Sequence, residues 1–360
     1  MQTPCYDIMI IGGGPAGANF ARRIDSEKYR VCLIDGSDEA HPKPCGGLIS
    51  PDAQAVLAKY HISLPKDLLV SPQLFSVRTI DLENGLTKYY KRNYLNVDRH
   101  EFDRFLLKMV PPTVSVIKAK CIDIAYLNGE FHITLKEGGS LFTVSCKQLV
   151  GADGASSLVR KNFFKNKPAQ KYIAIQQWFP AQNMNPYYSC LFDSSTSESC
   201  SWIFFKDHWF IFGGAFRKKG CREAFEKQKQ KLLALGLASE EALSLPAKTE
   251  ACEVLRPHAA YGMCRGSKGC YLIGEAAGFI SPSSLEGISY ALFSSEALAQ
   301  AINRSASPKK AFKKYKRKTV PLTLKIRLKC LKRPFMYHKI LRGLVMKSGI
   351  ATIKPYEAAR

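Results

Sequence analysis

The chain has 360 residues, and its composition, with 46% hydrophobic residues, 20 Phe and 16 Tyr, excludes a disordered protein and favours about two packed domains. Lys and Arg number 53 against 30 Asp and Glu, a formal charge of +23, but the excess is uneven, because residues 297–356 contain 17 basic residues and no acid. Such a segment favours an anionic lipid surface or an acidic substrate as its ligand; nucleic acid is not expected, because no nucleic-acid motif accompanies the charge.

The lack of a recognisable secretory signal and the spacing of the cysteines predict an intracellular protein. The apolar run at residues 8–11 is too short for a secretory signal, and no apolar run has the length of a membrane span. The 12 cysteines contain no C-x-x-C pair and no zinc spacing, so we expect reduced thiols, and the 7 histidines give no reason to predict a metal. We therefore expect a cytoplasmic protein, peripheral at the inner face of the cytoplasmic membrane if the basic segment binds lipid.

Three glycines separate an apolar run from a helical pattern near the start of the chain. The run Cys5–Ile11 predicts a buried strand, and the helical pattern begins at Pro15, a residue suited to the first turn of a helix. Gly12, Gly14 and Gly17 satisfy G-x-G-x-x-G, which allows a tight turn, close approach of a pyrophosphate and close packing of helix on strand. The motif predicts a dinucleotide site at the N-terminus of the helix.

A second strand, Arg30–Ile34, ends in Asp35, 18 residues after Gly17. A carboxylate at about this distance from the glycine motif hydrogen-bonds a ribose hydroxyl. An acid here favours the unphosphorylated ribose of FAD or NAD over that of NADP. The alternative is a glycine-rich turn without a ligand, but strand, helix and acid together favour the dinucleotide.

Three later segments bear on which dinucleotide is bound. "LNVDRHEFDRFL" (95–106) starts a helix near Arg99, and "LVGADGASSLVR" (149–160) reads as a strand, a turn with Asp153 and a helix start. "CYLIGEAAGFISPSSLEGISYAL" (270–292) reads as a buried strand, a Gly-Glu turn and a long helix. The last two repeat a strand–turn–helix arrangement that suits the phosphate and ribitol groups of FAD.

With "PCGGLISPDAQ" (44–54) and "YIAIQQWF" (172–179), these segments resemble the FAD-dependent oxidoreductases built on the para-hydroxybenzoate hydroxylase plan. Within them the sequence is similar, nearly end to end, to the geranylgeranyl reductase family and most of all to the bacterial CbrA-type proteins. The resemblance implies FAD and an α/β fold: a Rossmann-like FAD-binding domain of the para-hydroxybenzoate hydroxylase or glutathione reductase type, an antiparallel β-sheet substrate domain and a helical C-terminal tail. The expected boundaries are 1–68, 95–168 and 254–307 for the FAD-binding domain, 69–94 and 169–253 for the substrate domain, and 308–360 for the basic helical region.

The resemblance also implies roles for single residues. The glycine turn would hold the FAD pyrophosphate, and Asp35 would bind the adenosine ribose. Arg99 would lie near the FAD phosphates, and Asp153 would be part of the second fingerprint motif. Glu275 stands where the family has an Asp that contacts the ribityl chain. Because Glu is one methylene longer than Asp, this contact would be shifted or mediated by a water molecule. The expected cofactor-binding residues are Gly12, Gly14, Pro15, Ala16, Gly17, Asp35, Cys45, Gly46, Gly47, Arg99, Asp153, Gly154, Glu275, Gly278, Pro282 and Gly287.

The aromatic segments between the cofactor motifs predict a sheet that roofs the flavin. Residues 187–193, 200–216 and 248–255 alternate as antiparallel strands do. Residues 114–150 predict a small meander with Asn128-Gly129 as a hairpin turn. Residues 222–236 predict an amphipathic helix with a glycine stop, and 239–243 the start of another.

One strand of this sheet carries the expected substrate wall. Trp202, Phe204 and Lys206 match three residues of a Tyr-x-Trp-x-Phe-Pro-Lys segment in the reductase family, whose Tyr and Pro are replaced here. With Trp178, they would form an apolar wall for an isoprenoid, with Lys206 near a phosphate head. The alternative is that these residues alternate along a strand that is packed in a core.

Cys45 precedes two glycines, Gly46 and Gly47, which suggests a close approach of the backbone to a flat ring. In the reductase family the matching cysteine lies near the flavin and the reacting double bond. Cys45 is therefore the candidate catalytic residue, tuning the site or relaying a proton. The alternative is a small buried hydrophobe.

The basic C-terminal region divides into three parts. Residues 309–320 predict a charged helix end, whereas 322–335 mix helical and strand periods and receive no assignment. Residues 337–350 place Ile340, Leu341, Leu344 and Val345 on one helical face. A basic amphipathic helix suits an anionic membrane surface, and the alternative is a solvated helix packed on the FAD domain.

The resemblance predicts an FAD-dependent oxidoreductase that reduces a C=C bond of an isoprenoid or prenyl lipid. The sequence has no second G-x-G-x-x-G domain, so the electron donor, NAD(P)H or another reductant, stays open. The first alternative is a monooxygenase that hydroxylates or epoxidises an apolar substrate. The second is a non-catalytic FAD-containing lipid-binding protein.

Overall fold

The computed structural model describes residues 5–38, 44–181, 185–239, 243 and 245–355. Its contacts divide the chain into unit 1 (residues 1–43, 99–170 and 255–328) and unit 2 (44–98, 171–254 and 329–360). The predicted domains differ from these units, because residues 44–68 and 95–98 group with unit 2 and the basic region is divided at residue 328. The predicted helix start at 239–243 lies largely outside the described residues.

Unit 1 contains a sheet whose central strands run parallel, as the Rossmann-like prediction requires. β1 (Cys5–Ile11) pairs in parallel with β2 (Val31–Ile34) and β9 (Ser140–Gly151). The strand order is β15-β16-β9-β1-β2-β6, in which the remaining strands are β6 (Ser115–Ile117), β15 (Gly266–Ser267) and β16 (Cys270–Leu272). All four residues of β2 are buried, as expected for a strand with both faces covered.

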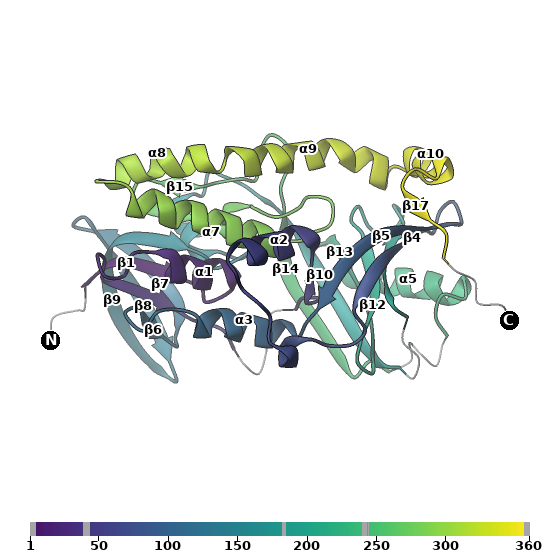
Figure 1. Cartoon of the computed structure of the whole chain (residues 1–360), viewed down its shortest axis with the longest axis horizontal. Helices are drawn as coiled ribbons and strands as arrows, with labels where there is room; N and C mark the ends of the chain where they lie inside the picture. Colours follow the sequence, from purple (N-terminus) through teal and green to yellow (C-terminus); the bar gives the residue numbers. More distant parts are fainter. Residues whose placement is uncertain (1–4, 39–43, 182–184, 240–242, 244, 356–360) are drawn as a thin grey trace. The chain divides into compact units, whose positions relative to one another are not determined.

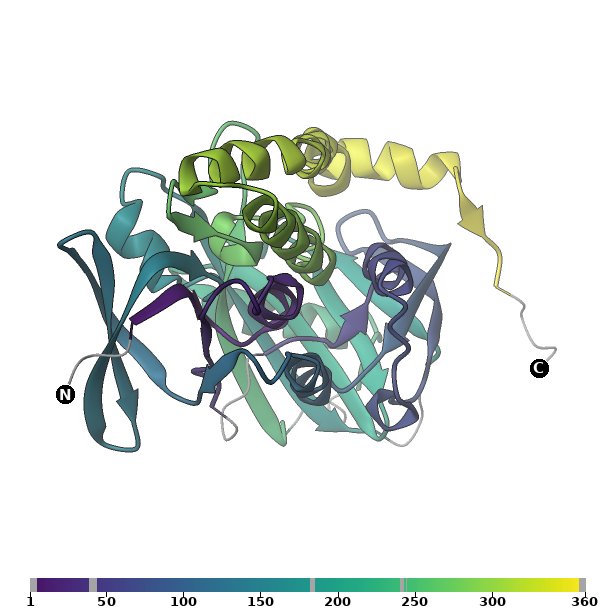
Figure 2. The same cartoon turned by 60° about the vertical axis from the view of Figure 1, so that its left-hand side comes forward.

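Helices cover this sheet. α1 (Pro15–Arg23) is the crossover between β1 and β2, and Figures 1 and 2 show α7 (Ile288–Asn303) running beside it. The side-chain amide of Asn19 joins the two helices by donating to the Leu292 carbonyl at 3.0 Å and to the Ser295 hydroxyl at 2.7 Å. The other helices of unit 1 are α3 (Arg99–Lys108), α4 (Leu158–Phe163), the 3₁₀ helix η2 (Gly274–Ala277) and α8 (Pro308–Lys318).

The predicted meander is confirmed. β7 (Lys120–Leu127) and β8 (Glu130–Glu137) form a hairpin that continues into β9. Asn128 and Gly129 have positive φ of 52° and 86°, the conformation that a two-residue turn of this kind requires.

Unit 2 is built on one curved sheet, and one of its pairings departs from the antiparallel prediction. The strand order is β14-β10-β13-β12-β11-β4-β5-β17, and β11 (Tyr187–Phe192) pairs in parallel with β4 (Leu74–Asp81). The chain leaves the sheet after β5 and returns through β10, so no hairpin fixes the direction of β11 against β4. The other elements here are β3 (Leu48–Ile49), α2 (Pro51–Lys59), η1 (Lys66–Leu68), β5 (Leu86–Asn96), β10 (Gln170–Pro180), β12 (Ser201–Lys206), β13 (Trp209–Arg217) and β14 (Lys248–Arg256).

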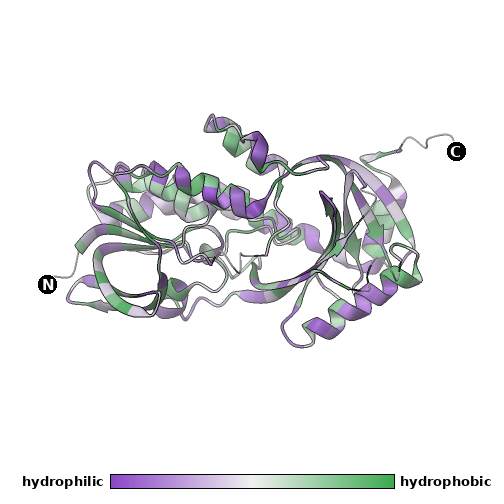
Figure 3. Ribbon diagram, turned by 90° about the horizontal axis from the view of Figure 1, so that it is seen from below, coloured by the Kyte–Doolittle hydropathy of each residue, from purple (hydrophilic) through white to green (hydrophobic). Residues whose placement is uncertain are grey.

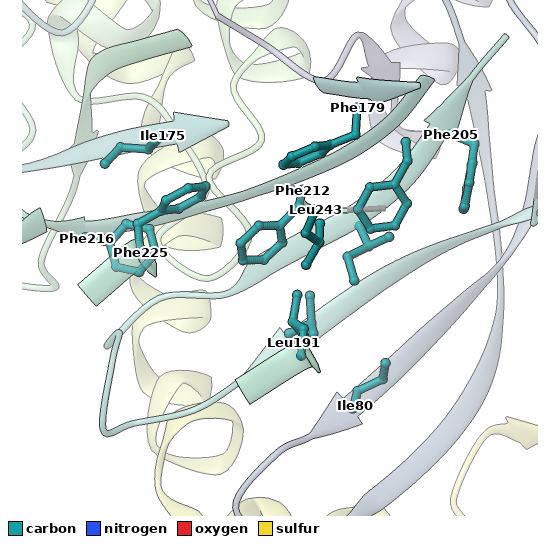
Figure 4. Close-up of a cluster of buried hydrophobic side chains, with 12 residues drawn as sticks. Ile80, Ile175, Phe179, Leu191, Phe205, Phe212, Phe216, Phe225 and Leu243 are labelled. Atoms are coloured by element: carbon teal, nitrogen blue, oxygen red, sulfur yellow. The ribbon is translucent and has the colours of Figure 1, made fainter. Parts of the chain in front are cut away.

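One face of this sheet packs on α5 (Cys221–Ala234), which confirms the predicted amphipathic helix. Figure 3 shows hydrophobic residues recurring along the strands with hydrophilic ones between them, and Figure 4 shows the aromatic cluster of this face. Phe212 and Phe225 stack with ring centroids 5.0 Å apart, and Phe216 meets Phe225 edge to face at 5.9 Å. This face is therefore a closed core, and the other face carries the predicted substrate wall.

The C-terminal region is helical. α9 (Val320–Tyr337) covers the segment that received no assignment, and α10 (Lys339–Ser348) and β17 (Thr352–Ile353) follow. Within unit 2, the buried guanidinium of Arg342 fixes α10 by donating at 2.7 Å to both Asp81 and Glu83. Over the described ranges, none of the helices combines the length and hydropathy that a membrane crossing requires.

Candidate functional site

The glycine turn of unit 1 has the geometry of a phosphate cradle. Gly12 has φ of +110°, and a Cβ at this position would lie 2.6 Å from the Ala152 carbonyl oxygen. A Cβ at Gly17 would lie 1.9 Å from the carbonyl oxygen of Gly12. Both positions therefore exclude a side chain for reasons of packing, as the motif predicts.

Gly14 differs from its neighbours because its surroundings are open. Among the described residues, no heavy atom lies within 4 Å of a Cβ built at Gly14, other than its chain neighbours and its own helix. Gly14 is the N-cap of α1, Pro15 occupies the first turn, and no side chain caps the helix. The first N–H groups of a helix have no partner within the helix, so the backbone of Ala16 and Gly17 is available to an anion.

Asp35 lies at the end of β2 and is buried, with 5% of its surface exposed. Its carboxylate accepts hydrogen bonds from the Ser37 N–H at 3.1 Å, the Ser37 hydroxyl at 2.9 Å and the Lys118 ammonium at 2.9 Å. An ionised carboxylate has about four acceptor positions, so one stays available for a ribose hydroxyl. The carboxylate also lies against Gly13, where a Cβ would be 2.6 Å from Oδ1. The sequence motif did not assign Gly13 a role.

Asp153 has one carboxylate oxygen in use and one that is not. Its Oδ2 accepts from the N–H groups of Leu158 at 2.7 Å and Val159 at 3.2 Å, at the start of α4. Its Oδ1 is buried and has no hydrogen-bond partner in the described part of the chain. Burial raises the pKa of Asp153 despite these hydrogen bonds. Gly154 follows with φ of +70°.

An unpaired buried carboxylate oxygen is costly, and a hydroxyl donated by a ligand would satisfy it. The open backbone at Gly14, the uncapped start of α1 and Oδ1 of Asp153 are all in unit 1 and all suit a ligand with phosphates and hydroxyls. These residues therefore fit a dinucleotide.

Glu275 lies in η2, between Gly274 and Gly278, which have φ of +56° and +77°. Its Oε1 accepts from the backbone N–H of Leu255 at 2.9 Å, so the longer side chain reaches a neighbouring strand end. A Cβ at Gly278 would lie 2.1 Å from the Gly262 carbonyl oxygen. The extra methylene relative to Asp therefore has a structural use in this chain.

Two buried arginines hold the loop that follows β16, and the sequence motifs did not reveal them. Arg160 donates to the carbonyls of Ala276 at 3.1 Å, Gly262 at 2.9 Å and Lys167 at 2.9 Å. Arg256 donates to the Pro282 carbonyl at 3.0 Å. The loop ends at Gly287, the N-cap of α7. These arginines make the loop around Gly278, Pro282 and Gly287 a fixed shape.

Arg99 is the first residue of α3, a helix that contacts α1. Its guanidinium forms two hydrogen bonds with Asp103 on the same helix, at 2.9 and 3.1 Å. The structure thus gives Arg99 a partner on its own helix, and its approach to the phosphates stays a prediction.

The predicted substrate residues share the open face of the sheet in unit 2. Trp202 pairs with Gly213, Phe204 with Ile211 and Lys206 with Trp209, so alternate residues of β12 and β13 point to the same side. Trp178 pairs with Ile211 on the other edge of β13 and is on this side too. We call this set of Trp178, Tyr188, Trp202, Phe204 and Trp209 the aromatic face.

The aromatic face is accessible and carries an acid. The three Trp residues and Tyr188 are partly exposed, whereas Phe204 is buried. A Cβ at Gly213 would lie 2.4 Å from Trp202 Nε1, so this glycine makes room for the indole, and that N–H is buried without a partner among the described residues. Glu250 Oε2 accepts from Trp178 Nε1 at 2.8 Å and from Gln176 at 2.7 Å, and Glu250 Oε1 pairs with Lys248 at 2.6 Å. Glu250, Trp209 and Tyr188 were not predicted, although alternation along the strands signals them.

Lys206 is a special case on this face. It is only 5% exposed, and its ammonium donates to the carbonyl of Val97. A contact between Lys206 and a phosphate head stays a prediction, because the observed partner is the backbone.

Cys45, Gly46 and Gly47 lie in unit 2 beside the aromatic face. A Cβ at Gly46 would lie 3.1 Å from the Phe204 ring, and Gly47 has φ of +63°. Cys45 is partly exposed, and a second thiol, that of Cys252, lies 3.8 Å from the Pro44 carbonyl oxygen. The structure therefore brings the segment of Cys45, Gly46 and Gly47 next to the aromatic face.

Comparison with known proteins shows which sequences this chain resembles. The chain is similar to Protein CbrA of Escherichia coli (strain K12), with 39% identity over 353 residues, which cover 97% of this chain and 98% of that protein. A model of the Lycopene cyclase protein family matches residues 7–179.

Solved structures show the same fold. A geranylgeranyl bacteriochlorophyll reductase-like protein from Thermoplasma acidophilum superposes with a TM-score of 0.79 at 18% identity, covering 96% of this chain and 91% of that one. PqsL of Pseudomonas aeruginosa, described as a probable FAD-dependent monooxygenase, superposes with a TM-score of 0.69 at 14% identity, covering 95% and 99%. The fold is that of flavin-dependent oxidoreductases, and the chain belongs to the CbrA family.

Proposed function

We propose that the chain is an FAD-dependent oxidoreductase that reduces a C=C bond of an isoprenoid lipid. The observation that supports the proposal is the cradle of unit 1, in which an open backbone at Gly14 and a buried unpaired oxygen of Asp153 both suit a ligand with phosphates and hydroxyls. FAD, when bound, supplies two-electron redox chemistry.

Each group of residues has a task in this proposal. The turn at Gly12–Gly17 and the start of α1 bind the pyrophosphate, while Asp35 and Asp153 accept hydrogen bonds from hydroxyls of the cofactor. The aromatic face offers an apolar surface to the lipid and excludes water. Its indoles stabilise positive charge that develops as an isolated alkene accepts a proton.

The proton has a candidate source in Cys45. This thiol is partly exposed, and the next residue is Gly46, where a Cβ would lie 3.1 Å from the Phe204 ring. In the proposed reaction the thiol, or a water beside it, gives the proton to the alkene carbon.

A monooxygenase is the second candidate function, supported by the fold similarity to PqsL. One experiment separates the candidates: the protein is reduced without oxygen, mixed with prenyl lipids of several chain lengths, and the lipids are analysed by mass spectrometry. Reoxidation of the protein with gain of two hydrogens by the lipid supports the reductase. Gain of oxygen by the lipid, only after air is admitted, supports the monooxygenase. If the lipid gains neither hydrogen nor oxygen, the result supports a lipid-binding protein without turnover.

A further inference from the structure

The helix α9 has two apolar sides, and only one of them is covered. Leu322 and Ile326 are buried, with 7% and 0% exposure. An outer stripe is exposed by 51–65%: Val320, Leu324, Leu328, Leu331 and Phe335. Their spacing of three and four residues places all five on one side of the helix.

α10 repeats the arrangement. Arg342 and Met346 are buried on its inner side, where Arg342 is bound to Asp81 and Glu83. On its outer side Ile340 and Leu344 are 66% and 61% exposed. The buried ion pair fixes this helix, so its apolar residues face outward as part of the folded structure.

Basic residues border the stripe. Helical spacing places Arg327 at one edge of it and Lys332 at the other, and both side chains are exposed. The segment 297–356 has 17 basic residues and no acid. This charge argues against a second copy of the chain as the occupant, because pairing two such stripes would place Lys and Arg against Lys and Arg.

An anionic bilayer surface satisfies both features. Its acyl region accepts the leucines and Phe335, and its headgroups accept the basic edges. We infer that α9 and α10 dock this protein on an anionic lipid surface, lying in the plane of the interface. The inference rests on exposure and charge alone and does not depend on the proposed redox reaction.

The test uses the full chain and two kinds of vesicle, phosphatidylcholine alone and an equal mixture with phosphatidylglycerol. The wild type should sediment with the mixed vesicles and lose binding in high salt. The triple variant Leu324→Gln, Leu331→Gln, Phe335→Gln should bind the mixed vesicles at least tenfold more weakly. The matched control is Leu141→Gln, a leucine of β9 with 61% exposure, which should bind like the wild type.

Circular dichroism checks that the triple variant is folded. If it is not, Leu331→Trp in the otherwise intact chain replaces it, and the fluorescence that this variant gains over the wild type should shift to the blue on mixed vesicles. Equal binding of wild type and a folded triple variant, equal binding to both vesicle types, or no blue shift in the Leu331→Trp variant would overturn the inference. A wild-type dimer that the triple variant converts to a monomer would overturn it in favour of a second copy.

Discussion

Replacing Gly14 by Val separates ligand binding from protein stability. Gly14 has φ of −68° and ψ of −175°, a conformation open to any residue, and a Cβ there meets no atom within 4 Å among the described residues. Replacing Gly by Val restricts the unfolded chain, which stabilises the folded state by about 0.4–1 kcal/mol. Val is a poorer N-cap than Gly by a similar amount, so the two effects oppose each other. The free energy of unfolding of the apoprotein should therefore change by less than about 1 kcal/mol.

The holoprotein should behave differently. A ligand present at about 100 times its Kd stabilises the folded state by about 2.7 kcal/mol, and a valine at the pyrophosphate position removes this contribution. Urea denaturation of apo and flavin-loaded samples, followed by circular dichroism, measures both quantities. Visible absorbance reports the flavin.

Two further substitutions calibrate the result. Gly139→Val is the matched control, because a Cβ at Gly139 also meets nothing within 4 Å in the described structure, and it should keep the flavin. Gly17→Ala should destabilise even the apoprotein, because its Cβ would lie 1.9 Å from the Gly12 carbonyl oxygen. Retention of stoichiometric flavin by the Gly14→Val variant would refute the cradle.

Three more substitutions test the buried ion pair of Arg342, the buried carboxylate of Asp153 and the partly exposed thiol of Cys45. Arg342→Ala should cost about 3–5 kcal/mol, because it leaves Asp81 and Glu83 without their cation, and Arg327→Ala at the surface is the control. Although burial alone raises them, hydrogen bonds from Arg342 and other donors hold the pKa of Asp81 and of Glu83 below the usual range. Wild-type stability should therefore fall as the pH drops below about 4, and this slope should shrink in Arg342→Ala; equal slopes would contradict the assignment. Asp153→Asn should stabilise the apoprotein at neutral pH. Burial raises the pKa of Asp153, so the protonated side chain favours the folded state at low pH, and this stabilisation is lost as the pH rises above about 4. The variant should nevertheless bind FAD more weakly in a titration. Cys45→Ala should keep FAD but slow lipid reduction in stopped flow, and unchanged turnover would leave Cys45 a packing residue.

The local parts of the site could be predicted from the sequence. The strand Cys5–Ile11, the glycine turn and Asp35 lie close together in the chain, so spacing alone placed them. The match to a segment of the reductase family singled out Trp202, Phe204 and Lys206, and the period of two of a strand explains why they share one face of β12.

The parts that depend on distant residues could not be predicted. Lys118 binds Asp35 from 83 positions away, and Arg160 holds carbonyls from three different segments. The parallel pairing of β11 with β4 joins strands that are separated by more than a hundred residues. α9 received no assignment because its leucines lie on both an inner and an outer side, which obscures the helical period.

Whether the cradle in unit 1 binds FAD can be measured as the flavin content of the purified chain. We expect a yellow protein from which heat releases about one FAD per chain, identified by mass spectrometry. A colourless protein that takes up no FAD when the nucleotide is offered would contradict this expectation.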